Sequence, residues 1–310
     1  MIRQQAFIDK KRMLKGGLHC HTTRSDGELS PEETIRLHKQ KGYDFLALTD
    51  HRLYNYKNFA PEVDITIIPG MEYNNHQVEG ISGIRTFHSV CLGPEKESGN
   101  LYGQDEYYPS VRADTQEEYQ ATLDTIHKKG NITIYCHPEW SATAVAHFGK
   151  LEGNFAVEIY NTGCDFNNDM DYDAPYWDQL LGMGKRIYGV AVDDAHAKRE
   201  YCNGYVMVNA ENNVNDIIAA LKEGKFYSSC GPEIYDFYVD GDKAVVECSP
   251  AAKIRLHSER HPTTVIRDSE GKLTRAEFDL TKNFAPYDYV RVSVGDSEGR
   301  LAWTNPIFLK

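Results

Sequence analysis

The stretch that decides the fold is Gly17-Leu18-His19-Cys20-His21, a short strand-like run with two histidines spaced two residues apart. Because side chains alternate between the two faces of a strand, the imidazoles of His19 and His21 share one face and Cys20 points to the other. Two nitrogen ligands are therefore presented together at the end of the first expected strand. What surrounds them depends on how the rest of the chain is organised.

Short β-branched or apolar runs alternate with amphipathic helical stretches from this strand to about residue 225. This alternation predicts a βα-repeated, mainly parallel sheet or barrel. Seven strands are expected, at Gly17–His21, Asp44–Thr49, Ile65–Pro69, Phe87–Leu92, Ile132–His137, Ala156–Tyr160 and Arg186–Val192.

Three of the intervening helices have readable boundaries. Ser30 is a good N-cap, Pro31 suits the first helical turn, and Gly42 ends the helix that they begin. The same pattern predicts helices at Thr115–Lys129 and Asn213–Glu223, each followed by a glycine. Their apolar residues at helical spacing are expected to pack in the core.

The pattern changes after about residue 230 to short alternating runs separated by turn residues, at Tyr235–Val239, Ala244–Cys248 and Tyr289–Val294. Alternation of this kind predicts antiparallel strands. We therefore expect two domains: a barrel-like domain over residues 1–230 and a small antiparallel β domain over residues 231–310.

The composition limits the partners and the compartment. A formal net charge of −12 over 310 residues repels a long polyanion, so binding to duplex nucleic acid is not expected. No apolar run is long enough to cross a bilayer, and Met1–Lys15 lacks the apolar stretch of a secretory signal. We expect a soluble, cytoplasmic protein with no membrane partner. Seven widely spaced cysteines without a CxxC pair indicate neither a disulfide framework nor a thiolate zinc site.

Other strand-like segments of the chain also end in His, Asp or Glu, the residue types that commonly bind metal ions. The relevant segments are Leu48-Thr49-Asp50-His51, Gly70-Met71-Glu72, Cys136-His137 and Asp193-Asp194-Ala195-His196. In a βα barrel the carboxyl ends of the strands converge on one rim, so these side chains are expected to meet. A ligand set of His, Asp and Glu suits zinc, manganese or iron and can hold more than one ion.

The remaining histidines are expected to be structural, because a lone histidine is more often a surface or satisfied core residue than a ligand. They are His38, His127 and His147 in helical stretches and His257 and His261 in the β domain. His76, in a loop, is a weaker ligand candidate than His88, which lies within its strand.

The ordered set of motifs resembles the PHP (polymerase and histidinol phosphatase) family over about residues 15–230. The segments that carry the resemblance are Leu18–Gly27, Leu48–His51, Gly70–Glu72, Cys136–Pro138 and Asp194–His196. A single His-x-His is a weak signal, whereas the full set, with Ser-Asp-Gly after the first pair, is specific. The resemblance implies a distorted seven-stranded (β/α)7 TIM-like barrel. Residues 231–310 are similar to the small, sandwich-like all-β domain appended to some members.

The resemblance also implies three metal sites built from nine ligands. Carried over position by position, His19, His21, bridging Glu72 and Asp194 hold one ion, Asp26, His51 and His196 hold a second, and Glu72, His88 and His137 hold the third. Asp26 stands where some members have histidine, a difference that keeps a ligand and can change the metal preference. We expect two to three divalent ions of manganese, zinc or iron as cofactors.

The charge of such a site favours phosphate. Three divalent cations bring about +6 and their carboxylates about −3, which leaves a positive pocket in an acidic protein. A metal-bridging hydroxide can serve as the nucleophile, so no protein nucleophile is required.

Residues around the expected ligands are candidates for supporting roles. Arg24 and Arg52 could clamp a substrate phosphate. Asp50 and Asp193 either orient ligand imidazoles or cap loops. The loops Tyr107–Pro109 and Asn161–Asp173 are candidate walls of the pocket.

The resemblance implies a hydrolase of phosphate ester bonds, and the acidic composition favours a phosphorylated small molecule or nucleotide as substrate. Trimming of short oligonucleotides by a 5′-3′ exonuclease of the same family is the main alternative. Histidinol phosphate is less favoured because of the appended β domain. Two other classes stay open: a non-catalytic metal-binding regulatory module, and metal-dependent hydrolysis of a C–N or C–O bond.

Overall fold

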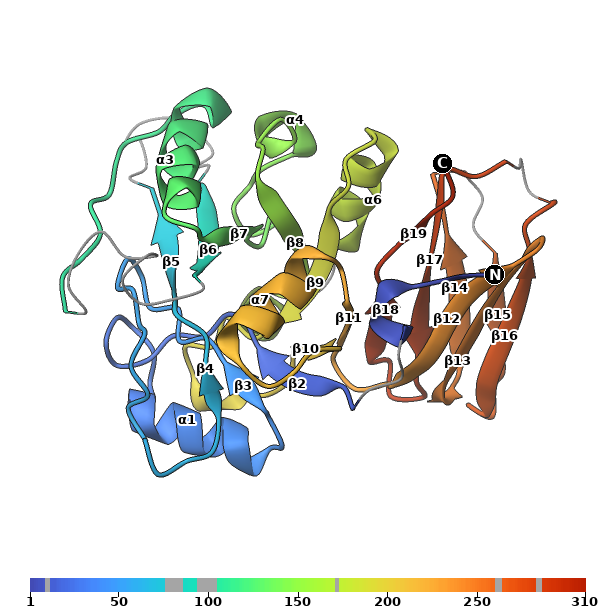
Figure 1. Cartoon of the computed structure of the whole chain (residues 1–310), viewed down its shortest axis with the longest axis horizontal. Coiled ribbons are helices and arrows are strands. Elements are labelled where there is room, and N and C mark those ends of the chain that lie inside the picture. Colours follow the sequence, from blue (N-terminus) through green and yellow to red (C-terminus); the bar gives the residue numbers. More distant parts are fainter. Residues whose placement is uncertain (9–11, 76–85, 94–104, 171–172, 260–263, 283–285) are drawn as a thin grey trace.

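The computed structural model describes residues 1–8, 12–75, 86–93, 105–170, 173–259, 264–282 and 286–310. Within these residues the chain forms a mixed α/β region followed by a sheet-rich C-terminal region (Figure 1). The expected α/β class is confirmed, and so is the antiparallel pairing of the C-terminal strands. The division into two domains at residue 230 stays a prediction.

One sheet of the α/β region has the strand order β5-β6-β7-β8-β9. β7, β8 and β9 run parallel to one another, whereas β6 is antiparallel to both of its neighbours. The strands are β5 (Gly70–Asn74), β6 (His88–Leu92), β7 (Ile132–Tyr135), β8 (Asn154–Asn161) and β9 (Tyr188–Val192). Most of their residues are buried, as expected for strands covered on both faces.

A second sheet runs from the α/β region into the C-terminal region in the order β4-β3-β2-β10-β11-β18-β17-β14-β15. β2, β3 and β4 are parallel, and the pairings beyond β2 are antiparallel. Its strands in the α/β region are β2 (Leu14–Gly17), β3 (Phe45–Leu46), β4 (Thr66–Ile67), β10 (Tyr205–Val208) and β11 (Phe226–Ser229).

Isolated bridges link the two sheets at both edges, between Cys20 and Ala195 on one side and between His51 and Glu72 on the other. The described residues form no continuous closed ladder of strands, so the seven-stranded barrel stays a prediction. All seven expected strands occur, and β5, β10 and β11 are additional. The first strand was placed too late, because β2 contains two glycines, which have low β propensity, and it ends at Gly17.

The helix boundaries expected from capping residues are confirmed. The Ser30 hydroxyl accepts a hydrogen bond from the Glu33 amide, and the Glu33 carboxylate accepts one from the Ser30 amide. The three helices concerned are α1 (Pro31–Gln40), α3 (Gln116–Lys128) and α7 (Val214–Lys222), capped by Ser30, Thr115 and Asn213.

Shorter helices complete the α/β region. They are α4 (Val145–Phe148), α5 (Thr162–Asn168) and α6 (Ala174–Gly182), with single 3-10 turns η1 (Gln5–Phe7) and η2 (Lys198–Glu200). In Figure 1, α3, α4 and α6 lie on one side of β5–β9, and α1 lies beside β3 and β4. No helix in the described ranges combines the length and the apolar character needed to cross a bilayer.

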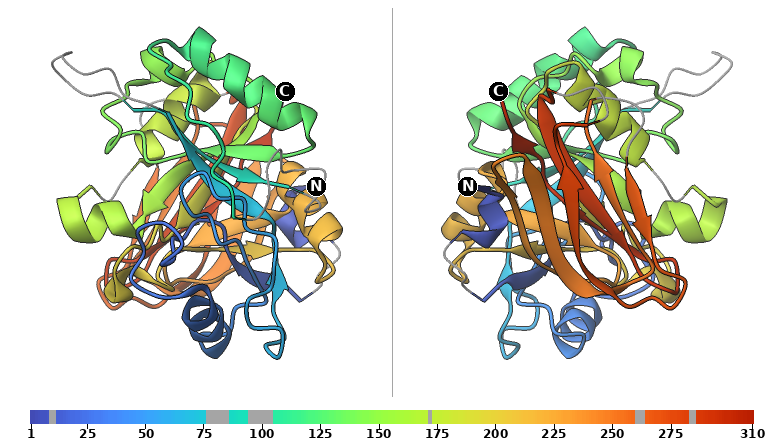
Figure 2. Two further views of the ribbon diagram at one scale, coloured as in Figure 1. Left: turned by 90° about the vertical axis from the view of Figure 1, so that its left-hand side faces the viewer. Right: turned by 90° about the vertical axis from the view of Figure 1, so that its right-hand side faces the viewer.

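The C-terminal region packs two antiparallel sheets against each other (Figures 1 and 2). One has the order β1-β12-β13-β16, and the other is the end of the long sheet, β18-β17-β14-β15, with β19 paired to β17. Apolar side chains of both sheets, such as Phe237 and Val292, fill the space between them. The strands are β1 (Ile2–Arg3), β12 (Ile234–Asp240), β13 (Lys243–Ala251), β14 (Lys253–His257), β15 (Val265–Arg267), β16 (Leu273–Asp279), β17 (Tyr289–Gly295), β18 (Leu301–Thr304) and β19 (Ile307–Phe308).

The two regions are connected by more than the long sheet. β1 pairs with β12, so the first residues of the chain belong to the C-terminal region. Arg291 of β17 is fully buried and donates to the Asp178 carboxylate of α6 at 2.9 Å through Nε. Its guanidinium also lies over the Trp177 ring at 4.4 Å. These contacts hold β17 against the α/β region.

Candidate metal centre

The nine expected ligands lie within the described residues. Most lie at strand ends or in the loops that follow strands, and Glu72 lies in the middle of β5. His19 and His21 follow β2, where backbone hydrogen bonds tie this turn to the turn after β9. The Asp194 amide donates to the His19 carbonyl at 3.0 Å, and the His21 amide donates to the Ala195 carbonyl at 3.1 Å. The expected convergence of distant strand ends therefore occurs.

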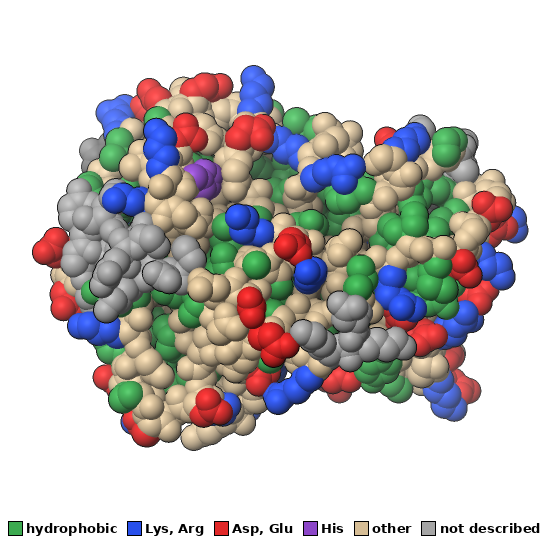
Figure 3. Space-filling view, viewed as in Figure 1, with side chains coloured by type: hydrophobic (Ala, Val, Ile, Leu, Met, Phe, Trp, Pro, Cys, Tyr) green, Lys and Arg blue, Asp and Glu red, His purple; other side chains and the backbone are tan. Residues whose placement is uncertain are grey.

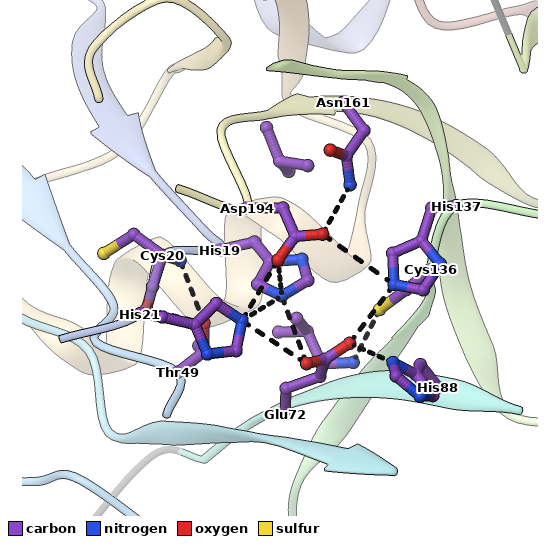
Figure 4. A network of polar contacts seen from close by, with 12 residues as sticks. His19, Cys20, His21, Thr49, Glu72, His88, Cys136, His137, Asn161 and Asp194 are labelled. Atoms are coloured by element: carbon purple, nitrogen blue, oxygen red, sulfur yellow. Dashed lines mark hydrogen bonds and ion pairs between the residues drawn. The ribbon is translucent and has the colours of Figure 1, made fainter. Parts of the chain in front are cut away.

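The first group of ligands is His19, His21, Glu72 and Asp194, whose ligand atoms all lie within 4.8 Å of one another. Asp194 Oδ1 is 3.1 Å from His19 Nε2 and 3.0 Å from His21 Nε2. Figure 4 shows the carboxylates of Glu72 and Asp194 turned toward these two rings. This is the set expected to hold one ion.

The tautomer of His19 directs a lone pair into this group. His19 Nδ1 lies 2.7 Å from Glu158 Oε1, and a carboxylate accepts, so the ring proton is on Nδ1. His19 Nε2 then faces His21 Nε2 at 3.3 Å, with carboxylate oxygens on either side. Converging nitrogen and oxygen lone pairs are what a divalent cation binds.

The second group contains Asp26, His51 and His196, and also His21. Asp26 lies 3.5 Å from His196 Nε2 and 3.6 Å from His51 Nε2. His196 Nδ1 donates to the Asp194 carbonyl at 2.9 Å, which leaves Nε2 to face Asp26. The Asp26 side chain is 51% exposed, so this end of the centre is open to solvent.

The third set, Glu72, His88 and His137, is also brought together. Glu72 Oε1 lies 2.8 Å from His88 Nδ1 and 3.3 Å from His137 Nε2. The thiol of Cys136 joins Glu72 and His137 in this group, which the sequence did not predict. Burial raises the pKa of the Cys136 thiol well above its usual range, so the thiol is protonated when no cation is bound.

Glu72 belongs to the first and third sets and contacts His51 of the second, and the surroundings of its Oε2 atom show whether a cation would fit. Glu72 Oε2 and His51 Nδ1 are both buried and face each other at 2.8 Å, yet neither has a hydrogen-bond partner in the described structure. Leaving a buried polar atom unsatisfied costs about 1–3 kcal/mol. A cation coordinated by these atoms would remove that cost, so the donor set fits bound metal.

The backbone at two ligands is strained. His137 has a φ of 26° and Asp194 a φ of 47°, both in the left-handed region that disfavours residues with a Cβ. Such strain costs about 1–3 kcal/mol per residue and clusters at functional sites. In this backbone conformation the His137 ring faces the Glu72 carboxylate, and the Asp194 carboxylate faces the rings of His19 and His21.

The charges of the centre favour bound cations. Burial opposes protonation of His21, but hydrogen bonds to Asp194 and Glu72 outweigh it and raise its pKa to about 10. His137 behaves alike, with a pKa raised to about 9. Burial also opposes ionisation of Glu72, yet the surrounding imidazoles hold its pKa well below the usual range. The carboxylates thus stay ionised, and their negative charge stabilises a positive charge next to them, either a proton on an imidazole or a metal ion bound by it.

The model of the PHP domain family matches residues 17–173, the segment that contains seven of the nine expected ligands. This chain belongs to the PHP family. A 5′-3′ exoribonuclease of Haemophilus influenzae is 39% identical over 178 residues, which are 56% of this chain and 59% of that protein. The chain thus spans less than two thirds of the length of this relative.

A solved structure shares the fold over nearly the whole chain. It is a two-domain protein from Bacteroides vulgatus described as containing a predicted PHP-like metal-dependent phosphoesterase. The TM-score is 0.50 over 99% of this chain and 98% of that chain, at 13% identity. At this identity the likeness shows the fold alone, and it extends through the C-terminal strands of this PHP protein.

The sequence did not reveal the residues that support the PHP ligands. Glu158 of β8 is completely buried and accepts hydrogen bonds from His19 Nδ1 at 2.7 Å and from the His137 amide at 2.9 Å. Asn161 Nδ2 donates to Glu158 at 3.0 Å and to Asp194 Oδ2 at 3.0 Å. The available signal was an acidic residue in the middle of an otherwise apolar strand.

Asp50 and Asp193 cap loops, which is one of the two roles considered for them. Asp50 accepts from the backbone amides of Thr22 at 2.8 Å and Ser25 at 3.2 Å. Asp193 accepts from the amides of three consecutive residues, Cys202, Asn203 and Gly204, at 2.6–2.8 Å. Within the described part of the chain, neither bonds to an imidazole of the nine ligands.

A cavity of about 260 Å³ opens onto the centre. Trp140 and residues 163, 164, 167 and 168 of α5 form part of its wall, so the predicted role of the 161–173 segment is confirmed for these positions. The Tyr107–Pro109 loop is not part of this wall. Arg52 Nη1 donates to the Tyr108 carbonyl at 3.2 Å and Arg24 pairs with Asp105 at 2.9 Å. Their action as phosphate clamps stays a prediction, and neither side chain lines the cavity.

His38, His127, His147 and His257 belong to none of the possible metal groups in the described ranges. His76 and His261 lie outside the described residues. All seven cysteines are free thiols.

Proposed function

We propose that this PHP protein is a metal-dependent phosphoesterase that hydrolyses the phosphate ester of a small molecule or nucleotide. The observation that carries the proposal is the buried Glu72 carboxylate, which belongs to two of the three converging sets of ligands and contacts His51 of the other. One of its oxygens has no hydrogen-bond partner among the described residues. Membership of the PHP family and the names of the relatives support it.

Two to three divalent ions would be held by residues already in position. His19, His21, Glu72 and Asp194 would hold one ion, Asp26, His51 and His196 a second, and Glu72, His88 and His137 a third. This mixture of imidazole and carboxylate donors suits zinc, manganese or iron. When bound, such ions acidify a coordinated water for attack and neutralise phosphate oxygens.

The protein's own residues would position the reaction. Glu158 and Asn161 fix the orientation of His19 and Asp194. Asp26, at the open end of the centre, marks the side from which an anionic substrate would enter. Trp140 packs against the His137 ring at 4.9 Å and is 43% exposed, so it would border the group attached to the phosphate.

A second candidate is the trimming of oligonucleotides from the 5′ end. The 39% identical relative, named a 5′-3′ exoribonuclease, favours this activity. A cavity of about 260 Å³ is just below the usual range of ligand pockets, roughly 300–1,000 Å³, so it would enclose a terminal phosphate with its attached group and leave the rest of a chain outside.

Metal analysis combined with a substrate screen tests the proposal. Protein prepared without chelators is expected to contain two to three equivalents of metal and to hydrolyse an aryl phosphate, a nucleotide or a 5′-phosphorylated oligonucleotide. Glu72→Gln should abolish turnover, whereas the exposed control Glu152→Gln should leave it unchanged. Bound metal without turnover of any phosphate ester would instead indicate a regulatory module. Turnover of an amide or lactone alone would indicate C–N or C–O hydrolysis.

A further inference from the structure

Three cations stand together on one face of the C-terminal sheet, far along the chain from the metal ligands. Lys253 and Arg255 lie on β14, and Arg267 of β15 is directly opposite Lys253 in the antiparallel register. Residues two apart on a strand share a face, so all three side chains rise from the same side. They line a hollow of about 430 Å³ together with Ser293 and Leu301. We call these three cations and their hollow the C-terminal basic cleft.

The charges of the basic cleft are not compensated within the protein. In the described structure none of the three cations takes part in an ion pair. Asp296, next to β17 in the chain, is engaged by Arg300 at 2.8 Å. Like charges placed directly opposite each other destabilise a sheet, and a bound polyanion would relieve that repulsion.

The basic cleft also contrasts with the rest of the surface. The whole chain carries a formal charge of −12, and Figure 3 shows acidic and basic side chains interspersed on the face that it draws. Lys253 lies across Gly295, where an added Cβ would sit 2.6 Å from its Cε. The missing side chain at Gly295 therefore gives Lys253 room to extend along the sheet. Arg255 and Arg267 are exposed.

The basic cleft is connected to the metal centre by neighbouring hollows. Leu301 lines the cleft and also a second hollow of about 320 Å³, whose wall contains Phe166 and Trp303. Phe166 belongs to α5, and its neighbour Asn167 lines the metal cavity. Consecutive residues of one helix thus border both hollows, so a ligand could pass from the metal centre over α5 to the C-terminal sheet.

The intermediate hollow has aromatic groups. Phe166 is 42% exposed, and the Trp303 ring packs on Tyr160 at 6.2 Å. Trp303 Nε1 is buried and has no hydrogen-bond partner among the described residues, so a donor is left for a ligand. The hollow is also lined by Arg300 and by the carboxylates of Asp165 and Glu298, and of the two rings only Phe166 is exposed enough for a base to stack on it. An exposed ring between cationic groups is typical of surfaces that bind single-stranded nucleic acid, because bases stack on rings and phosphates pair with cations.

We propose that the C-terminal basic cleft binds internal phosphates of a single-stranded oligonucleotide whose 5′ end occupies the metal cavity. This inference rests on the proposed phosphoesterase function in its oligonucleotide-trimming form. A mononucleotide or aryl phosphate fills only the metal cavity, whereas a longer strand reaches the C-terminal sheet. The cleft would therefore select for chain length.

Binding to RNA tests the cleft without relying on turnover. The probe is a fluorescent 12-nucleotide single-stranded RNA with phosphorothioate linkages, measured by anisotropy against the metal-loaded full chain at several salt concentrations. Each lost phosphate contact lowers the slope of log K against log salt by about 0.7, so the triple variant Lys253→Gln, Arg255→Gln, Arg267→Gln should lower it by about 2. Affinity at 0.1 M salt should fall roughly 100-fold.

A matched control removes the same charge elsewhere. Lys41, Lys128 and Lys129 are exposed, and their combined change to Gln should alter RNA affinity by no more than about 2-fold. Equal loss in both triple variants would overturn the proposal, and so would unchanged binding in the cleft variant. Tighter binding of poly-glutamate than of the RNA would overturn it as well.

Hydrolysis of an aryl phosphate by the same variants separates this inference from the proposed function. The cleft variant should keep the kcat and KM of the wild type on the aryl phosphate and show a raised KM on the 12-nucleotide RNA. If the wild type hydrolyses no phosphate ester while RNA binding still depends on the cleft, the proposed function fails. If aryl phosphate is hydrolysed and the cleft variant binds RNA as tightly as the wild type, only the cleft proposal fails.

Discussion

Glu158→Gln gives a sharp test of how the metal centre is held in place. The carboxylate faces three donors with its two oxygens: His19 Nδ1 at 2.7 Å, the His137 amide at 2.9 Å and Asn161 Nδ2 at 3.0 Å. Glutamine has the same size but only one accepting oxygen. Whichever way its amide is turned, the NH₂ group meets at least one N–H, and a buried hydrogen bond is lost.

The loss of one buried hydrogen bond sets the expected loss of metal affinity in Glu158→Gln. One unsatisfied buried donor costs about 1–3 kcal/mol. Partners of metal-binding histidines typically contribute 10–100-fold to metal affinity, which corresponds to about 1.4–2.7 kcal/mol. We therefore expect Glu158→Gln to weaken metal binding by about 10–100-fold, chiefly through His19.

Calorimetric titration of zinc or manganese into metal-free protein measures this change. The control is Glu152→Gln, because the Glu152 side chain is 80% exposed and, among the described residues, forms an ion pair with Lys185 alone. Circular dichroism shows whether each variant is folded. A folded Glu158→Gln protein that binds metal within 2-fold of the wild type would refute the orienting role of Glu158.

Three further changes probe the centre and the contact between the two regions. Glu72→Gln should lower the bound metal by at least one ion per chain, measured by mass spectrometry of the purified protein, and full occupancy would contradict the shared role of Glu72. Asp178→Asn leaves the buried Arg291 guanidinium without its counter-charge, and we expect the free energy of unfolding, measured with urea, to fall by about 2–4 kcal/mol. This is less than the loss expected for a fully buried ion pair, because Asp178 is partly exposed. A loss below 0.5 kcal/mol, as is usual for surface substitutions, would show that the pair is not structural. Burial, and next the Arg291 charge, lower the pKa of His257 to about 4, so the folded state keeps it neutral and the wild type should lose stability as the pH falls from about 6.5 to 4. Relative to the wild type, His257→Gln should lose less stability over that range, and parallel curves for the two proteins would exclude the effect.

The sequence predicted which side chains would gather at one place better than it predicted the residues around them. The position of a strand end is a local property, and the residues there, such as His51 and Asp194, can be read directly. Their convergence follows from the general geometry of parallel strands. Ser30 and Glu33 likewise define a helix start by contacts within four residues.

The features that the sequence did not predict depend on contacts between segments far apart in the chain. Glu158 supports His19 across 139 positions of the chain, and nothing local distinguishes it from a surface acid except its apolar neighbours. The cysteine pattern predicted no thiolate metal site, and only the packed structure places the Cys136 thiol beside Glu72. The pairing of β11 with β18 depends on residues 71 or more apart, too far for a local pattern to indicate.

Anomalous diffraction from crystals grown with manganese and without chelators tests the gathering of these ligands around Glu72 most directly. We expect one peak among His19, His21, Glu72 and Asp194 and at least one more beside Asp26, His51 and His196 or beside His88 and His137. A map with no peak next to Glu72, from protein that is folded and exposed to manganese, would contradict a shared metal centre.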